Sequence, residues 1–68
     1  MNFTIEMDRE LDGRWIAEVK ELPGVLAYGA SRDDAIHRVK SLAFYTMANM
    51  IEHDEIVPGI QNFFSVTA

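Results

Sequence analysis

The sequence predicts a single α+β domain, an antiparallel sheet with one helix packed on one face, in the order β-β-β-α-β. Three observations lead to this prediction. The first twenty residues alternate with a period of two, the stretch after residue 31 has an apolar stripe of helical spacing, and turn residues separate these parts. No repeat, linker or low-complexity tract interrupts the chain, so we expect residues 1–68 to form one domain.

The first two strands are expected on either side of an Asp-Gly turn. Apolar and polar residues alternate through residues 2–8, which predicts a strand with one apolar face. Asp12-Gly13 tolerates the positive φ of a hairpin turn, so the second strand is expected over residues 14–20. We expect Trp15 to be the large core side chain of this second strand, with Ile16 as its competitor for the core face.

A second turn and a helix cap define the middle of the chain. Pro23-Gly24 fits the two central positions of a type II turn, and a third strand is expected from Val25 to Gly29. Ser31 is the expected N-cap of a helix over about residues 32–52. Asp33 and Asp34 lie in the first helical turn, where their negative charges interact favourably with the helix dipole. Asp34 can also act as the acidic arm of a capping box.

The apolar face of this helix is wider than a three-stranded sheet can cover. One stripe is formed by Ala35, Val39, Leu42, Thr46 and Met50, and the adjacent stripe by Ile36, Ala43, Met47 and Ile51. Phe44 and Tyr45 lie partly outside both stripes. We expect the surplus apolar surface to lie at an interface with another molecule.

The end of the chain is expected to add a last strand over residues 60–67, after the Pro58-Gly59 turn. In that strand Phe63 and Phe64 would point to opposite faces, so one aromatic ring would leave the core. An edge strand with an outward aromatic side chain is a template for strand addition by another chain.

Composition predicts association. A domain of 68 residues buries only about 60% of the surface that its unfolded chain exposes, and chains of this size often depend on disulfides, metals or oligomerisation. This sequence has no cysteine and two histidines, yet 49% of its residues are hydrophobic. We therefore expect a homo-oligomer, a dimer or tetramer, with an interface that includes Phe44, Met47, Ile51, Phe63 and Phe64.

Charge and hydropathy exclude several classes of function. The formal net charge is -5, which disfavours nucleic-acid binding, because phosphate contact requires a basic stripe. The acidic chain is suited to a basic protein partner. We expect no membrane span and no signal peptide, and the lack of cysteine agrees with a cytoplasmic location.

An ordered set of short motifs within residues 2–55 resembles the HicB family. An acidic hairpin with Asp12-Gly13 comes first. It is followed by an aromatic residue, Ala17-Glu18-Val19, Leu22-Pro23-Gly24, Gly29 and the helix start from Ser31 to Ala35. Each motif alone is common, and the resemblance rests on their joint order and spacing.

The resemblance implies a degraded ribonuclease-H-like domain that acts as the antitoxin of a type II toxin–antitoxin system. Such a domain binds a small basic HicA-type mRNA endonuclease and blocks its catalytic face. Full-length members of the family usually add a C-terminal DNA-binding domain, and because this chain ends at Ala68 we expect no direct DNA binding. The contact residues we expect are an aromatic residue of the last strand and Glu6, Asp8, Glu10 and Asp12.

We expect neither enzymatic activity nor a bound cofactor or metal. Ribonuclease-H-type catalysis needs converging carboxylates around paired Mg²⁺ ions, and the acidic residues to consider are Glu6, Asp8, Glu18, Asp33 and Asp34. Helix capping accounts for the last two, and a solvated hairpin accounts for Asp8. His37 and His53 are too far apart in sequence, and too few, to predict a zinc site.

An orphan HicB-like domain that associates only with itself, in a structural or small-ligand-binding role, is the alternative. In that case the broad helix face serves contacts between identical subunits. A reading frame for a basic, double-stranded-RNA-binding-like protein beside this gene would favour the antitoxin. An isolated gene would favour the alternative.

Overall fold

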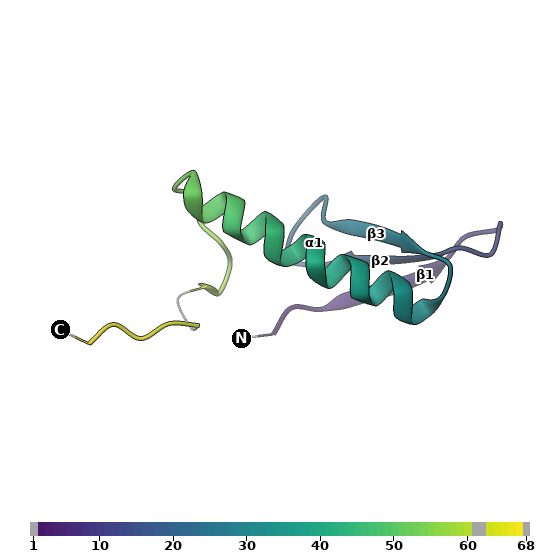
Figure 1. The fold of residues 1–68 in the computed structure, drawn as a ribbon, viewed down its shortest axis with the longest axis horizontal. Helices are drawn as coiled ribbons and strands as arrows, with labels where there is room; N and C mark the ends of the chain where they lie inside the picture. Colours follow the sequence, from purple (N-terminus) through teal and green to yellow (C-terminus); the bar gives the residue numbers. More distant parts are fainter. Residues whose placement is uncertain (1, 61–62, 68) are drawn as a thin grey trace.

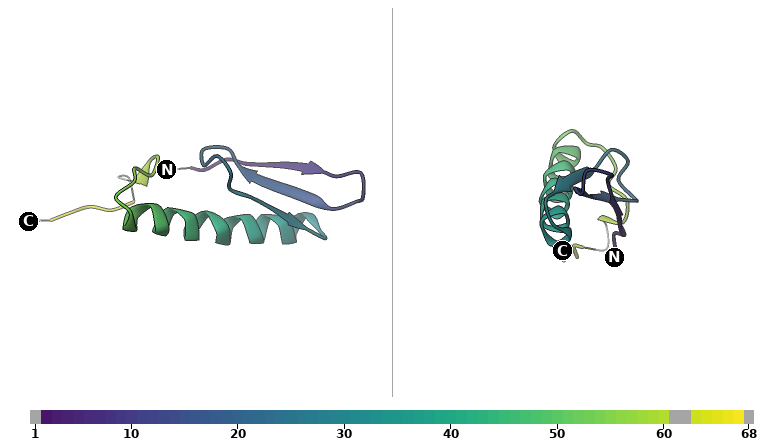
Figure 2. Two further views of the ribbon diagram at one scale, coloured as in Figure 1. Left: turned by 90° about the horizontal axis from the view of Figure 1, so that it is seen from above. Right: turned by 90° about the vertical axis from the view of Figure 1, so that its right-hand side faces the viewer.

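A computed structural model describes residues 2–60 and 63–67. Its elements are β1 (Ile5–Arg9), β2 (Trp15–Val19), β3 (Leu26–Gly29) and α1 (Arg32–Glu52). The strands form an antiparallel sheet in the order β1-β2-β3, and α1 lies along one face of that sheet (Figures 1 and 2). The α+β class, the antiparallel sheet and the helix on one face are therefore confirmed.

Both predicted turns have the expected backbone. At the hairpin, the N–H of Gly13 donates to the carbonyl of Glu10 at 3.0 Å, and Gly13 has a φ of 92°. At the second turn, the N–H of Val25 donates to the carbonyl of Leu22 at 3.0 Å, and Gly24 has a φ of 86°. A positive φ at the third position of this turn is the mark of type II geometry.

The start of α1 is held by side chains, as expected. The Ser31 hydroxyl accepts a hydrogen bond from the N–H of Asp34 at 3.0 Å. The Asp34 carboxylate in turn accepts from the N–H of Ala30 at 3.3 Å and from Nε of Arg38 at 3.2 Å. The reciprocal pattern of a capping box is present, with its acidic arm reaching one residue before the cap.

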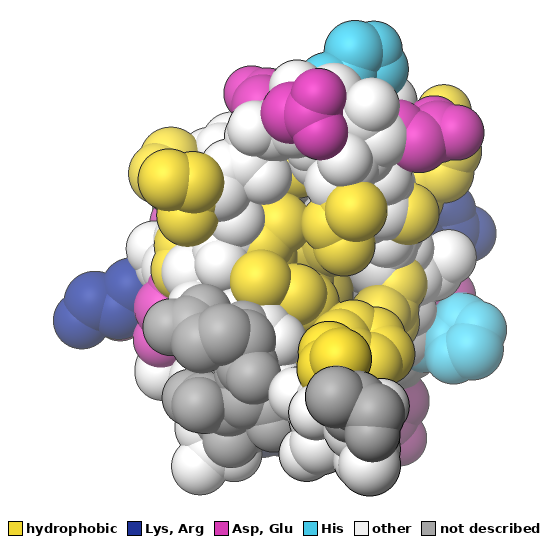
Figure 3. Space-filling model, turned by 90° about the vertical axis from the view of Figure 1, so that its left-hand side faces the viewer, with side chains coloured by type: hydrophobic (Ala, Val, Ile, Leu, Met, Phe, Trp, Pro, Cys, Tyr) yellow, Lys and Arg dark blue, Asp and Glu magenta, His cyan; other side chains and the backbone are white. Residues whose placement is uncertain are grey.

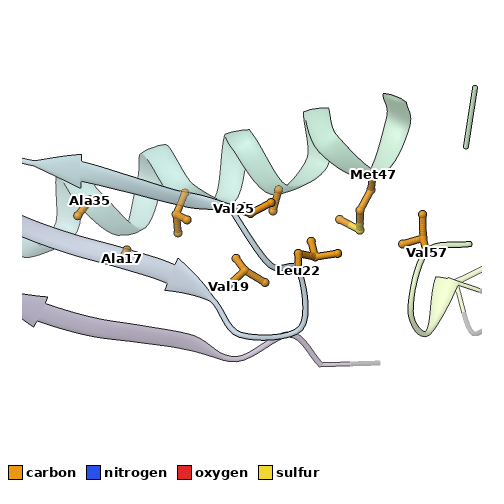
Figure 4. Packing of buried hydrophobic residues seen from close by; sticks show 9 residues of the cluster. Ala17, Val19, Leu22, Val25, Ala35, Met47 and Val57 are labelled. Atoms are coloured by element: carbon orange, nitrogen blue, oxygen red, sulfur yellow. The ribbon is translucent and has the colours of Figure 1, made fainter. Parts of the chain in front are cut away.

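The core is made of small side chains between α1 and the sheet. Its helical part is a single row of spacing four, Ala35, Val39, Ala43 and Met47. The other buried hydrophobic residues are Ala17, Val19, Leu22, Val25 and Val57 (Figure 4). Trp15 lies on the predicted core side of β2 but is only partly buried, with the Arg9 guanidinium 5.1 Å from its ring centroid. Alanines at the centre let helix and sheet approach closely, and this leaves the large aromatic ring at the edge.

The helix is much longer than the strands that it covers. Its 21 residues span about 31 Å, whereas five residues of β1 or β2 span about 17 Å. The C-terminal half of α1 therefore extends past the sheet (Figure 2). Met47 points from this half into the space between Leu22 and Val57, which close the core at that end (Figure 4).

The segment after α1 differs from its prediction. His53 caps the helix, Asp54 turns the chain with a φ of 59°, and Val57 is buried. The described residues of the segment 60–67 do not form the expected strand. Local hydrogen bonds close turns at its start instead, such as the one that the Ile60 N–H donates to the Val57 carbonyl. Because α1 overhangs the sheet, the chain leaves it beyond the ends of the strands (Figure 1). A strand formed there would have no neighbouring strand to pair with its backbone.

Within the described residues, no helix combines the length and the hydrophobicity that crossing a bilayer requires.

Substitution of Gly29 by alanine is expected to lower the free energy of unfolding by at least about 2 kcal/mol, because it overpacks the contact between β3 and α1. A Cβ at Gly29 would collide with the backbone nitrogen of Ala35 and lie 2.8 Å from the Cα of that residue. Urea unfolding followed by circular dichroism measures the loss. Ala30→Ser, at the exposed neighbour, is the control, and equal stability of the two variants would contradict this packing.

Acid is expected to destabilise the fold, with Asp34 among the causes. Hydrogen bonds from the Arg38 side chain and from the Ala30 N–H hold the pKa of Asp34 below its ordinary 3.8. A lowered pKa stabilises the folded chain above the unfolded pKa, and this contribution disappears as the pH falls through the folded pKa. The pKa values of Asp12 and Glu21 are lowered by hydrogen bonds from the backbone N–H groups of Arg14 and Thr4, so they act in the same direction.

Asp34→Asn should therefore reduce the loss of unfolding free energy below about pH 5. Ser31→Ala is the matched control, because it removes an uncharged cap and should cost about 1 kcal/mol at every pH. Urea titrations at a series of pH values measure both effects. The same pH dependence in Asp34→Asn and in the unsubstituted chain would show that the pair with Arg38 does not contribute.

Candidate protein-binding surfaces

The face of the sheet opposite α1 is open and carries two rows of side chains. The strand register places Glu6 beside Glu18, and Glu18 beside Leu26. The next row is formed by Asp8, Ile16 and Tyr28 in the same order across the strands. Each row therefore begins with a carboxylate on β1 and ends with an apolar or aromatic side chain on β3.

The pairing of Glu6 with Glu18 is unfavourable for the isolated chain. Side chains directly opposite each other on antiparallel strands have Cβ atoms about 5 Å apart, and like charges in such a pair are destabilising. Both glutamates are exposed, and neither makes a side-chain hydrogen bond or ion pair within the described residues. The pair does not stabilise the isolated chain. A cation of another molecule could bind between the two carboxylates and would remove their repulsion.

Three of the four predicted acidic contact residues gather at one hollow on this face. The hollow has a volume of about 330 Å³ and is lined by Glu6, Met7, Asp8, Glu10, Ile16 and Glu18. Its lining thus combines four carboxylates with two apolar side chains. A hollow of this composition suits a long cationic side chain, whose methylene groups can lie on Ile16 while its charge meets the carboxylates.

The fourth predicted residue, Asp12, belongs to the hairpin turn instead. Its carboxylate accepts hydrogen bonds from the backbone N–H of Arg14 at 3.0 Å and from the Arg14 side chain at 2.8 Å. Arg14 also stacks on Tyr28, with 4.5 Å between the guanidinium carbon and the ring centroid. Asp12 thus orders the turn and holds an arginine over the aromatic end of the second row.

A second surface lies at the far end of the molecule, where α1 overhangs the sheet. We call it the distal apolar surface, formed by Phe44, Met47, Ile51, Ile60, Phe63 and Phe64. Hydrophobic side chains gather at this end of the molecule, with acidic groups toward its margin (Figure 3). All five residues of the predicted oligomer interface belong to this surface.

The distal apolar surface contains both hollows and projections. One groove of about 360 Å³ runs between the start of the chain and α1, and a smaller hollow of about 190 Å³ adjoins it. Both are lined by Phe44, Met47 and Phe63. Met47 is buried and belongs to the floor, while Phe44 is 63% exposed and Phe64 is 71% exposed. The rings of Phe63 and Phe64 meet edge to face, 6.3 Å between centroids, instead of pointing to opposite sides as expected.

Three of the five carboxylates considered for metal binding line the hollow of the open sheet face, and the other two lie elsewhere. Asp33 and Asp34 lie in the first turn of α1, on the other side of the sheet from Glu6 and Asp8. In the described part of the chain, no three His, Cys, Asp or Glu side chains converge as metal ligands would. The ring Nδ1 of His53 lies 2.8 Å from the Asn49 carbonyl oxygen, at the end of the helix.

Comparisons with known proteins found no matching family model, no matching curated protein and no matching solved structure.

Sequence reasoning missed part of the open sheet face. Glu18 was considered as a metal ligand and Ile16 as a competitor of Trp15 for the core, yet both line the acidic hollow. Leu26 and Tyr28 complete the two rows. Alternation along β2 places Glu18 opposite the core, but its position beside Glu6 depends on the register between strands.

Replacement of Glu18 by lysine is expected to raise the free energy of unfolding by about 0.5 kcal/mol, because a cross-strand repulsion becomes an attraction. Urea unfolding at low ionic strength measures the gain, which should shrink in high salt. Glu55→Lys makes the same change of charge away from the sheet and is the control. An equal gain in the two variants would assign the effect to net charge alone.

Proposed function

We propose that this protein is a HicB-like antitoxin that binds a small basic HicA-type mRNA endonuclease in the cytoplasm and masks its catalytic face. The observation that carries the proposal is the open sheet face, on which Glu6, Asp8 and Glu18 lie exposed and without a partner cation in the described chain. The motif order that resembles the HicB family supports the same assignment.

Charge complementarity is the first part of the proposed mechanism. The net charge of -5 gives the chain a field that attracts a basic protein, and the carboxylates of the open face concentrate it on one side of the sheet. Such complementarity raises the association rate and favours the correct partner more than it raises affinity. A cationic side chain placed between Glu6 and Glu18 would also relieve their repulsion.

Steric masking is the second part. Ile16, Leu26 and Tyr28 give the open face an apolar half next to its acidic half. A partner with a basic, RNA-binding face would meet both halves, since such faces combine cationic and stacking side chains. Once that face lies on the sheet, mRNA has no access to it, and the antitoxin needs no catalytic group of its own.

An orphan domain that binds only itself is a second proposal, and the distal apolar surface favours it. That surface offers apolar contact area without any need for a basic partner. The two proposals differ in what copurifies with the chain. Co-expression with the small basic protein encoded beside it should give a complex without endonuclease activity if the antitoxin proposal holds, and no complex if the chain is an orphan.

The charge-reversal variant with Glu6→Lys and Asp8→Lys is expected to associate with that endonuclease at least about 10-fold more slowly at low salt, because electrostatic attraction at this face accelerates encounter. Stopped-flow fluorescence measures the association rate.

The matched control is Glu52→Lys with Glu55→Lys, which changes the net charge equally at the other end of the molecule. Equal slowing in both double variants would show that only the total charge matters. It would contradict the open sheet face as the binding surface. Failure of the unsubstituted chain to bind the endonuclease at all would reject the antitoxin proposal itself.

A further inference from the structure

We infer that the distal apolar surface seats a second copy of this chain, related by a two-fold axis, so that the protein is a homodimer. The groove along α1 and the hollow next to it form one continuous surface, because Phe44, Met47 and Phe63 line both. Among the described residues, Lys40 is the only charged one that lines either of them. The occupant must therefore be largely apolar.

The size of the molecular surface agrees with a missing partner of this kind. A monomeric protein of 7.7 kDa exposes about 4,300 Å², whereas this chain exposes 5238 Å². Its radius of gyration is 13.9 Å, compared with about 11 Å for a compact domain of this length. The excess of about 900 Å² comes from this extended shape, and it is large enough to supply the roughly 800 Å² that each partner buries in a standard interface.

The shape of the surface favours an identical partner over an unrelated one. A two-fold interface places the same patch on both subunits, so the patch must contain both projections and the hollows that receive them. Phe64 projects with 71% of its surface exposed, and the groove of about 360 Å³ lies next to it. A ring of one copy can thus fill the groove of the other, and the reverse contact forms at the same time.

Charge identifies this surface as the place where two copies meet. Each chain has a net charge of -5, so most contacts between two copies bring like charges together. The open sheet face, with Glu6, Asp8 and Glu18, is the least suitable. The distal apolar surface avoids this repulsion, and its use leaves both open sheet faces free.

Sedimentation equilibrium of the full chain over the micromolar range tests the inference, with Phe44→Glu as the disrupting variant. The unsubstituted chain should sediment with twice the mass of one chain. Phe44→Glu should raise the dissociation constant at least about 100-fold, because a two-fold interface loses the apolar contact twice and gains two buried charges. Tyr45→Glu is the control, since Tyr45 is also an exposed aromatic residue of α1, at 74%, and lines neither hollow.

Phe64→Glu, which lies outside the helix, should weaken the dimer in the same way, and circular dichroism checks that all three variants keep their helix. A monomer at every concentration, or equal weakening by Phe44→Glu and Tyr45→Glu, would overturn the inference. So would a monomeric chain whose binding to the basic endonuclease is lost in Phe44→Glu, since the groove would then belong to that partner. Phe44 does not line the hollow that Glu6 and Glu18 share, so the dimer and the antitoxin proposal can fail separately.

Discussion

The difference in length between α1 and the strands is the constraint on which the rest of this structure depends. The first half of the helix is covered by the sheet through Ala35 and Val39, while the second half extends beyond it. Leu22, Val57, the start of the chain and the described residues after Val57 cover that second half incompletely. A core of small side chains and an exposed apolar end are therefore two consequences of one geometry.

The sheet separates two surfaces with different chemistry. On the helix side the contacts are apolar, and the apolar side chains that the sheet does not cover form the distal apolar surface. On the open side, Glu6 and Glu18 repel each other, and Leu26 and Tyr28 remain partly exposed. Neither property stabilises an isolated chain. Each becomes favourable only when another molecule supplies the missing contact, a cation on one side and an apolar patch on the other.

Local backbone chemistry made the first half of the fold predictable. Gly13, Gly24 and Ser31 act on their immediate neighbours, and the turns and cap that they predict are present. The buried row of α1 was predicted less well, because it takes members from both predicted apolar stripes. The position of the sheet decides which side of a wide apolar face is buried. The strand over residues 60–67 was wrong for its described residues, since alternation cannot show whether a sheet edge lies within reach. The acidic rows depend on register, so Glu18 was placed on the correct face without its partner Glu6.

The two proposed contacts are coupled through the net charge. Two copies joined at the distal apolar surface carry a combined charge of about twice -5, and this repulsion opposes dimer formation, although salt screens it over about 8 Å. A basic protein bound to each open sheet face would neutralise part of that charge and so strengthen the dimer. Because linkage is reciprocal, the dimer would bind the basic partner more tightly than a single chain by the same factor. Surfaces on opposite sides of the sheet can therefore reinforce each other without any change in the fold.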